Sequence, residues 1–184
     1  LIKFSNKQYD KALQDFQLGI ELAENLENYR LKFSVNTNIG LVYDRLDMLE
    51  ESIIYFRKSL DKANELGFPY TKAITHLNLS AAYQKSNEPT LAFLHADSSY
   101  HLFIQQNYLQ HIAKPCIIKV VSYLTKGDFD QALTLIDSAI YYSKLNENLD
   151  DVLESYKLKS KIYRKMELFE EALETYMMYS ETKD

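Results

Sequence analysis

The sequence has few residues that would interrupt a helix. Its 184 residues include only four glycines and three prolines, the two residue types that are least compatible with a helix interior. Hydrophobic residues make up 46% of the chain and charged residues 26%, which is the composition of a soluble globular protein. We therefore expect an all-α fold, in a chain long enough to bury a sizeable core.

Other scarcities exclude whole classes of protein. The one cysteine, Cys116, cannot form an internal disulfide, and we expect it to be a small buried core residue. No apolar run approaches the roughly 20 residues of a membrane span, so we expect no membrane segment in this chain. The net charge of −5 disfavours direct nucleic-acid binding, which needs a concentrated basic face. The compartment stays open between the cytoplasm, which is favoured, and the periplasm.

Motifs for catalysis are also missing. The four histidines, His76, His95, His101 and His111, do not have the spacing of a metal site. The chain has neither a glycine-rich phosphate loop nor the GxSxG turn that carries a nucleophilic serine. We therefore predict that the chain is not an enzyme and that it has no catalytic residue, no metal site and no cofactor.

The chain does contain a repeat of forty residues. A small residue recurs at Ala12, Ser52, Ala92, Ala132 and Ala172. Tyrosine recurs at Tyr43, Tyr83, Tyr123 and Tyr163. After Tyr123, a Lys-Gly-Asp turn leads to an apolar stripe at Ala132, Ile136 and Ala139, whose spacings of four and three belong to one helix face. Each unit is therefore predicted to be a hairpin of two helices that approach closely at the small residue.

The repeat predicts a series of helices joined by short turns. The expected ranges are 8–25, 28–46, 50–66, 70–86, 87–105, 108–126, 128–144, 150–166 and 168–180. Gly67 should end one helix, and Pro69 should lie in the first turn of the next. Pro115 should kink its helix or delay its start, because a proline in a helix interior costs about 3 kcal/mol. Each hairpin leaves an apolar side that only the next hairpin can cover, so the hairpins should stack.

These residues resemble the tetratricopeptide repeat. The first full copy carries Asn38, Ile39, Gly40, Tyr43, Ser52, Phe56 and Ser59. Later copies carry Asn78, Leu79, Ser80, Tyr83 and Ala92, and then Gly127, Asp128, Phe129, Ala132 and Ala139. The usual early tryptophan is replaced by Asn36, His76, Cys116 and Tyr156. The period of forty exceeds the usual period of about 34, and this long form is similar to the helical sensor regions of bacterial regulators.

The resemblance implies a right-handed α-solenoid that forms one TPR-like domain over residues 1–184. It consists of a half repeat at 1–27 and of repeats at about 28–67, 68–107, 108–147 and 148–184. Because the half repeat begins at Leu1 rather than at a methionine, we expect the chain to be a piece of a longer protein.

In this family the leading helix of each pair lines the concave face, where partners bind. Carried onto this sequence, the partner-binding residues are Thr37, Asn38, Leu41, Leu77, Asn78, Ala81, Lys85, Ile117, Val121, Leu124, Lys157, Lys161, Arg164 and Lys165. This face would be polar at its start, apolar in its middle and basic at its end. Such a face suits a peptide or partner helix with an apolar centre and an acidic end.

Each part of this face has a second interpretation. Asn38 and Asn78 could each bond the N–H and the C=O of an extended peptide, or they could cap or bridge neighbouring helices. The basic group could receive a carboxylate or a phosphate, or it could be a solvated helix face. The apolar stripe in the middle could form a pocket, or a tighter superhelix could cover it.

The sequence thus predicts a protein- or peptide-binding module, the sensing or regulatory region of a larger bacterial signalling protein or transcriptional regulator. The alternative is a structural scaffold or self-association platform without a small ligand, of which a homodimer would be one form.

Overall fold

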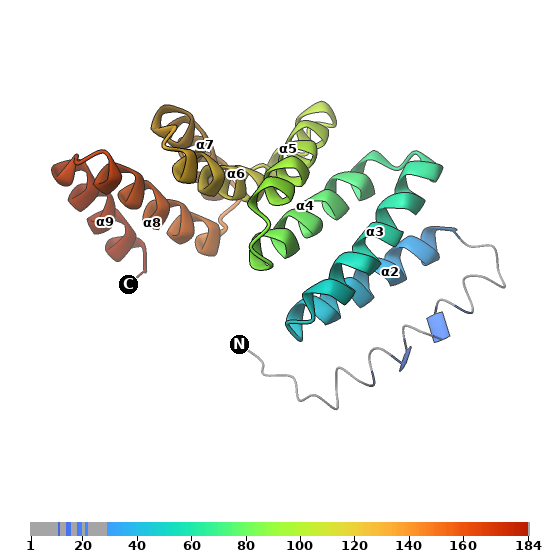
Figure 1. Ribbon diagram of the computed structural model, residues 1–184. Helices are drawn as coiled ribbons and strands as arrows, with labels where there is room; N and C mark the ends of the chain where they lie inside the picture. Colours follow the sequence, from blue (N-terminus) through green and yellow to red (C-terminus); the bar gives the residue numbers. More distant parts are fainter. Residues whose placement is uncertain (1–10, 12–13, 16–17, 20, 22–28, 184) are drawn as a thin grey trace. The chain divides into compact units, whose positions relative to one another are not determined.

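The computed structural model describes residues 11, 14–15, 18–19 and 21 and the continuous segment 29–183. In this part of the chain there are α-helices, one short 3-10 helix and no strand. The helices are α2 (Tyr29–Arg45), α3 (Leu49–Leu66), α4 (Pro69–Lys85), α5 (Pro89–Gln105), η1 (Leu109–His111), α6 (Ala113–Lys126), α7 (Phe129–Leu145), α8 (Leu149–Lys165) and α9 (Phe169–Lys183), in the order that Figure 1 shows. The all-α prediction is confirmed, whereas the helix expected over 8–25 falls mainly outside the described residues.

The chain divides into two units between Glu88 and Pro89, and each is described by itself. In the first unit, α3 packs against both α2 and α4. In the second unit, α6 contacts α5, α7 and α8, and α8 packs against α7 and α9. Within each unit the contacts thus run between helices that are close in sequence, as expected for stacked hairpins. A single domain over residues 1–184 stays a prediction.

The turns repeat every twenty residues with the same backbone geometry. A residue with positive φ lies just after each of the α-helices α2 to α8, at Asp47, Gly67, Asn87, Asn107, Gly127, Glu147 and Glu167, with φ between 53° and 78°. The next amide bonds back to a carbonyl five residues earlier, as Met48 N–H does to Tyr43 at 2.9 Å and Asp128 N–H does to Tyr123 at 3.0 Å. This is the Schellman helix end. Each repeat contains two such turns, which gives the period of forty residues.

Small residues sit where paired helices cross. Ser52, Ala92, Ala132 and Ala172 are all buried, as the repeat predicts, while Ala12 lies outside the described residues. In the α2–α3 hairpin a glycine allows a close contact between the two helices. A Cβ added at Gly40 would lie 2.6 Å from two ring carbons of Phe56, which is less than any van der Waals contact. Phe56 can therefore lie flat against α2 only because residue 40 has no side chain.

Pro115 delays the start of its helix. The segment after α5 first forms η1, and α6 begins only at Ala113, so Pro115 is the third residue of the helix. The amides of a first helical turn have no intrahelical acceptor, so the missing N–H of proline costs nothing there. The predicted delay is confirmed.

Candidate functional site

In the first unit, α2 and α4 are the leading helices of successive hairpins and carry the residues expected on the partner-binding face. We define the amide surface as Asn38, Leu41, Asn78, Ala81 and Lys85. Asn38 is exposed and Asn78 is half-buried, and neither side chain hydrogen-bonds another described residue. A residue that caps or bridges helices needs such a bond. The geometry therefore favours side-chain amides that are open to a partner.

A salt bridge links α2 to α4 near the C-terminal ends of both helices. Lys85 Nζ lies 2.7 Å from Oδ1 and 2.6 Å from Oδ2 of Asp44. Leu41 is exposed, and Leu77 and Ala81 are half-buried. Thr37 is different, because its Oγ1 lies 2.7 Å from Ser59 Oγ of α3. Thr37 is thus turned into its own hairpin, and we leave it out of the open surface.

The apolar stripe expected on α6 is largely buried. Ile117 is 1% exposed and Leu124 is 7% exposed, while Val121 is half-buried. The physical reason is that α6 has neighbours on several sides, since it contacts α5, α7, α8 and η1. The assignment of Ile117 and Leu124 to an open binding face is therefore wrong, and the alternative, that other helices cover the stripe, holds for these two residues.

The basic residues of α8 lie on one exposed face. We call Lys157, Lys161, Arg164 and Lys165 the cationic row. All four are exposed and none forms an ion pair with another described residue. By contrast, Lys159 on another side of α8 lies 2.6 Å from Asp137. Burial opposes the charge of Lys159, but the hydrogen bond and charge of Asp137 outweigh it and raise the pKa of the amine.

Two overlapping cavities of about 360 and 460 Å³ lie between the cationic row and α9. Arg164, Ser160, Phe169 and Tyr176 line both of them. The Ser160 hydroxyl donates a hydrogen bond of 2.8 Å to the carbonyl oxygen of Ala172, which holds α8 directly against α9. Cations thus lie on one side of this hollow and aromatic rings on the other.

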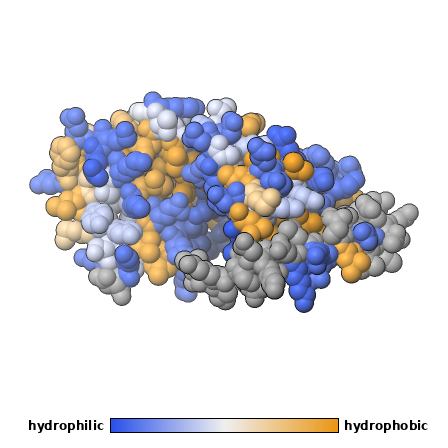
Figure 2. Space-filling model, turned by 60° about the horizontal axis from the view of Figure 1, so that its bottom comes forward, coloured by the Kyte–Doolittle hydropathy of each residue, from blue (hydrophilic) through white to orange (hydrophobic). Residues whose placement is uncertain are grey.

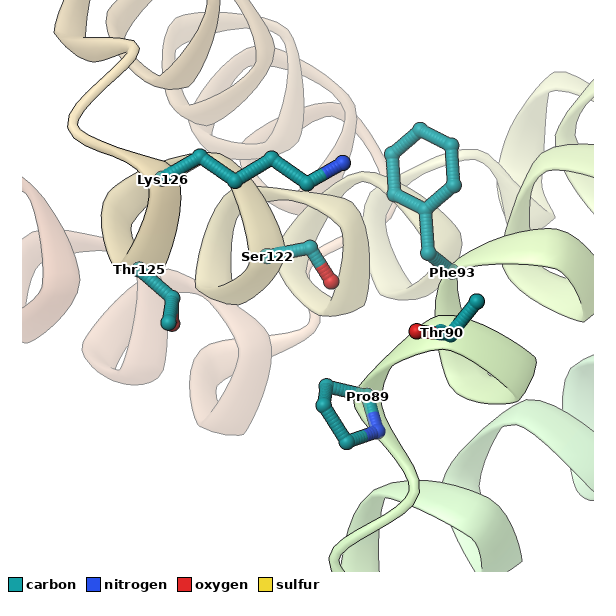
Figure 3. Close-up of a pocket in the computed structure, with 6 residues that line it drawn as sticks. All are labelled: Pro89, Thr90, Phe93, Ser122, Thr125 and Lys126. Carbon is teal, nitrogen blue, oxygen red and sulfur yellow. The ribbon is translucent and has the colours of Figure 1, made fainter.

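A smaller pocket of about 140 Å³ lies between α5 and α6 (Figure 3). Its walls are formed by Pro89, Thr90, Phe93, Ser122, Thr125 and Lys126. In Figure 3 the side chain of Lys126 extends toward the Phe93 ring, with Nζ 5.2 Å from the ring centroid. The sequence does not indicate this pocket, because no repeat position or motif relates Phe93 to a residue of the following leading helix.

A buried lysine joins the same two helices. Lys119 Nζ lies 2.5 Å from Asp97 Oδ1, and its side chain is only 8% exposed. The ring centroids of Tyr100 and Phe93 lie 4.7 Å and 5.6 Å from the ammonium. Because carboxylate and rings together compensate the buried charge, we interpret Lys119 as a residue that fixes α6 on α5.

The side chains that could take part in catalysis or metal binding are either buried or far from one another in the described segments. Cys116 is fully buried, and burial raises the pKa of its thiol to about 12, so it is a neutral core residue near pH 7, as expected. Burial also lowers the pKa of His111. In the described segments, no three side chains of His, Cys, Asp or Glu are close enough together to hold a metal ion. No helix of those segments is both long enough and apolar enough to cross a bilayer.

Comparison with known proteins agrees with this architecture. Residues 33–61 match the family model described as Tetratricopeptide repeat. The crystal structure of BtubC (BKLC) from P. vanneervenii superposes with a TM-score of 0.86 at 15% identity, over 96% of this chain and 73% of that chain. The chain has a tetratricopeptide-repeat fold. The TPR-like α-solenoid expected from the sequence is thereby confirmed as a fold.

Two Rap proteins share the fold over part of their length. The apo form of RapI matches with a TM-score of 0.68 at 17% identity, over 97% of this chain and 63% of that chain. A Rap protein complexed with Competence and Sporulation Factor matches with a TM-score of 0.68 at 15% identity, over 96% of this chain and 59% of that chain. This chain thus spans about three fifths of each Rap protein. No curated protein sequence matches it.

Proposed function

We propose that the chain is a protein- or peptide-binding module and that its amide surface holds the backbone of an extended peptide. The observation that carries the proposal is the pair Asn38 and Asn78, forty residues apart on successive leading helices, with side-chain amides that bond no other described residue. Each side chain amide can donate to a peptide C=O and accept from a peptide N–H. Such bonds recognise backbone rather than sequence.

The two amides belong to different helices. In the first unit α3 packs against both α2 and α4, whereas α2 and α4 themselves meet only at a few residues. The amides would therefore bond different peptide groups along one extended segment, which advances about 3.3 Å per residue. Leu41, exposed one turn after Asn38, would contact an apolar side chain of the same peptide. The Asp44–Lys85 salt bridge links the two helices that carry the amides.

We further propose that this module is the sensing or regulatory region of a larger bacterial protein. The fold is shared with a Rap protein whose structure contains Competence and Sporulation Factor, and the chain spans only 59% of that protein. A peptide that binds one arrangement of the hairpins better than another shifts the population toward it, and an attached domain can respond. The coding sequence on either side of this segment tests this role. A kinase or DNA-binding domain there supports it, and repeats alone contradict it.

Binding itself is tested with a displayed library of random peptides. Peptides retained by the wild-type chain should bind the single variants Asn38→Ala and Asn78→Ala about 2- to 10-fold more weakly, the equivalent of one or two hydrogen bonds. Asn64→Ala is the matched control, because Asn64 is an exposed asparagine on the trailing helix α3. If Asn38→Ala and Asn78→Ala both leave the dissociation constants and the melting curves unchanged, the amide surface does not bind the peptide.

A further inference from the structure

The pocket between α5 and α6 lies where α5 departs from the forty-residue repeat. Pro89 is the first residue of α5, and at the same repeat position the trailing helices α3 and α7 carry the half-buried side chains of Leu49 and Phe129. A proline ring is smaller than either of these side chains. α5 therefore begins with less bulk than α3 and α7 do, at the place where the hollow of about 140 Å³ lies.

A buried hydroxyl in this pocket has no hydrogen-bond partner. Ser122 is 7% exposed, and its side chain bonds no other described residue. By contrast, Thr125 of the same helix donates to the carbonyl oxygen of Val121 at 2.8 Å. In Figure 3 the hydroxyls of Ser122 and Thr90 are directed toward each other across the pocket. Because an unpaired hydroxyl in a protein interior costs free energy, a ligand that bonds Ser122 gains by that bond.

The repeat shows that these two hydroxyls are specific to this pocket. At the position of Ser122 the other copies have only apolar residues, namely Ile2, Val42, Ala82 and Ile162. At the position of Thr90 they have only acidic residues, namely Asp10, Glu50, Asp130 and Glu170. Since an apolar residue satisfies the packing in every other copy, the fold does not require the hydroxyl of Ser122.

The pocket carries positive charge without a carboxylate. Lys126 is exposed and forms no ion pair with another described residue, and its Nζ lies 5.2 Å from the centroid of the Phe93 ring. The other full copies place a cation one residue earlier, at Arg45, Lys85 and Lys165, and one residue turns a helix by 100°. The cation of this copy is thereby moved to the side that faces α5. No described acidic residue lines the pocket or lies in the first turn of α5.

These groups specify the chemistry of a ligand. The two hydroxyls and the ammonium of Lys126 can all donate hydrogen bonds, and an ionised carboxylate only accepts them. The rings of Phe93 and Pro89 offer apolar contact. A cavity of about 150 Å³ holds a molecule of the size of benzene, and butyrate has as many non-hydrogen atoms as benzene. Figure 2 shows hydrophobic and hydrophilic surface side by side over the C-terminal part of the chain, at the left of the view.

We propose that this pocket binds a carboxylate carried on a short aliphatic chain. The carboxylate accepts hydrogen bonds from Ser122 and Lys126, and the methylene groups of the chain contact the ring of Phe93. Two ligands share this chemistry, the glutamate side chain of a protein partner and a free short-chain fatty acid. The site is independent of the amide surface, which lies in the other unit.

An NMR titration with butyrate tests the binding of a free carboxylate. We expect saturable shifts of the backbone amides of Ser122 and Lys126. Butyramide, which keeps the shape and lacks the charge, should bind about 10-fold more weakly. Ser122→Ala and Lys126→Met should each weaken the binding of butyrate about 5- to 10-fold. Lys165→Met is the matched control and should leave it unchanged, because Lys165 is an exposed lysine at the end of the leading helix α8.

The stability of the free protein gives a second readout. Alanine occupies the position of Ser122 in another copy, at Ala82, and removing an unpaired buried hydroxyl removes its cost. Ser122→Ala should therefore leave the melting temperature unchanged or raise it, while it weakens the binding of butyrate. A lower melting temperature would contradict the unpaired hydroxyl on which the proposal rests.

Two acetylated and amidated tripeptides, Gly-Glu-Gly and Gly-Gln-Gly, distinguish the two sources of the carboxylate. Because Thr90 and Lys126 are exposed, a side chain attached to a backbone can enter, and we expect the glutamate peptide to bind at least about 10-fold more tightly than the glutamine peptide. Binding of butyrate without binding of the glutamate peptide assigns the pocket to a free acid.

The proposal is overturned if neither butyrate nor the glutamate peptide binds. It is also overturned if the wild type, Ser122→Ala and Lys126→Met all bind butyrate equally well. Asn38→Ala should bind butyrate as the wild type does, so the result for this pocket is separate from the fate of the proposed amide surface.

Discussion

Gly40 of α2 lies directly against the ring of Phe56 of α3, so closely that a methyl group at residue 40 would stand 2.6 Å from two ring carbons. Phe56 is almost fully buried and has no room to withdraw. This contact sets the separation of the first described hairpin, and with it the position of Asn38 and Leu41 two residues before and one residue after the glycine.

Gly40→Ala should therefore destabilise the chain in spite of the better helix propensity of alanine. Overpacking a core costs about 1–3 kcal/mol, and the gain in propensity returns about 1 kcal/mol. In a Phe56→Leu background the clash is relieved, and the same substitution should become neutral or stabilising. Urea unfolding of the four proteins of this cycle measures the coupling. Equal effects of Gly40→Ala in both backgrounds would show that the ring contact does not limit the helix approach.

The turns offer a stabilising substitution. Glu147 and Glu167 have φ of 53° and 62°, a backbone region that costs an L-residue roughly 1–2 kcal/mol and costs glycine little. Glu147→Gly should raise the free energy of unfolding by about 1 kcal/mol. Glu174→Gly inside α9 should lower it by a similar amount. A thermal melt in which both variants lose stability contradicts the assigned turn geometry.

Removing the partner of Lys119 should be costly. Asp97→Asn leaves the buried ammonium without its carboxylate and should cost about 1–3 kcal/mol, less than for a fully buried pair because the Asp97 side chain is 36% exposed. Adding Lys119→Met removes the charge and should recover most of the loss. Asp137→Asn, forty residues later, should cost less, because the Asp137 side chain is 58% exposed. Chemical denaturation ranks these variants, and a double variant no better than Asp97→Asn would refute the role given to Lys119.

His111 makes stability sensitive to acid. Burial lowers its pKa below the ordinary 6.5, so the unfolded chain takes up this proton at a higher pH than the folded chain does. The stability contributed by the neutral ring is complete above about pH 6.5 and is lost as the pH falls from there through the folded pKa. The free energy of unfolding should fall more steeply below pH 6.5 in the wild type than in His111→Gln. Parallel curves for the two proteins would contradict this prediction.

The fold could be predicted because its determinants are local. The forty-residue recurrence of Ala132 and Tyr123 reflects a helix crossing and a helix end, and both are fixed within one hairpin. Gly67 and Pro115 act on the backbone at their own positions, so their effects could also be read from the sequence.

What could not be predicted depends on neighbours from other parts of the chain. Ile117 and Leu124 form an apolar stripe, but a stripe does not reveal how many helices surround it, and α6 has several. The Asp97–Lys119 pair joins helices whose relative rotation no single helix fixes. The positive φ of Glu147 could not be predicted either, because glutamate has no preference for the left-handed conformation of this turn.

The peptide backbone itself gives the most direct test of the amide surface. A peptide retained by the wild-type chain is made again with each backbone amide N-methylated in turn, and the dissociation constant of each is measured by calorimetry. We expect two separate sensitive positions, of which one loses its effect in Asn38→Ala and the other in Asn78→Ala. Sensitivity that is spread evenly along the peptide, or that stays unchanged in both variants, would contradict backbone recognition by these two asparagines.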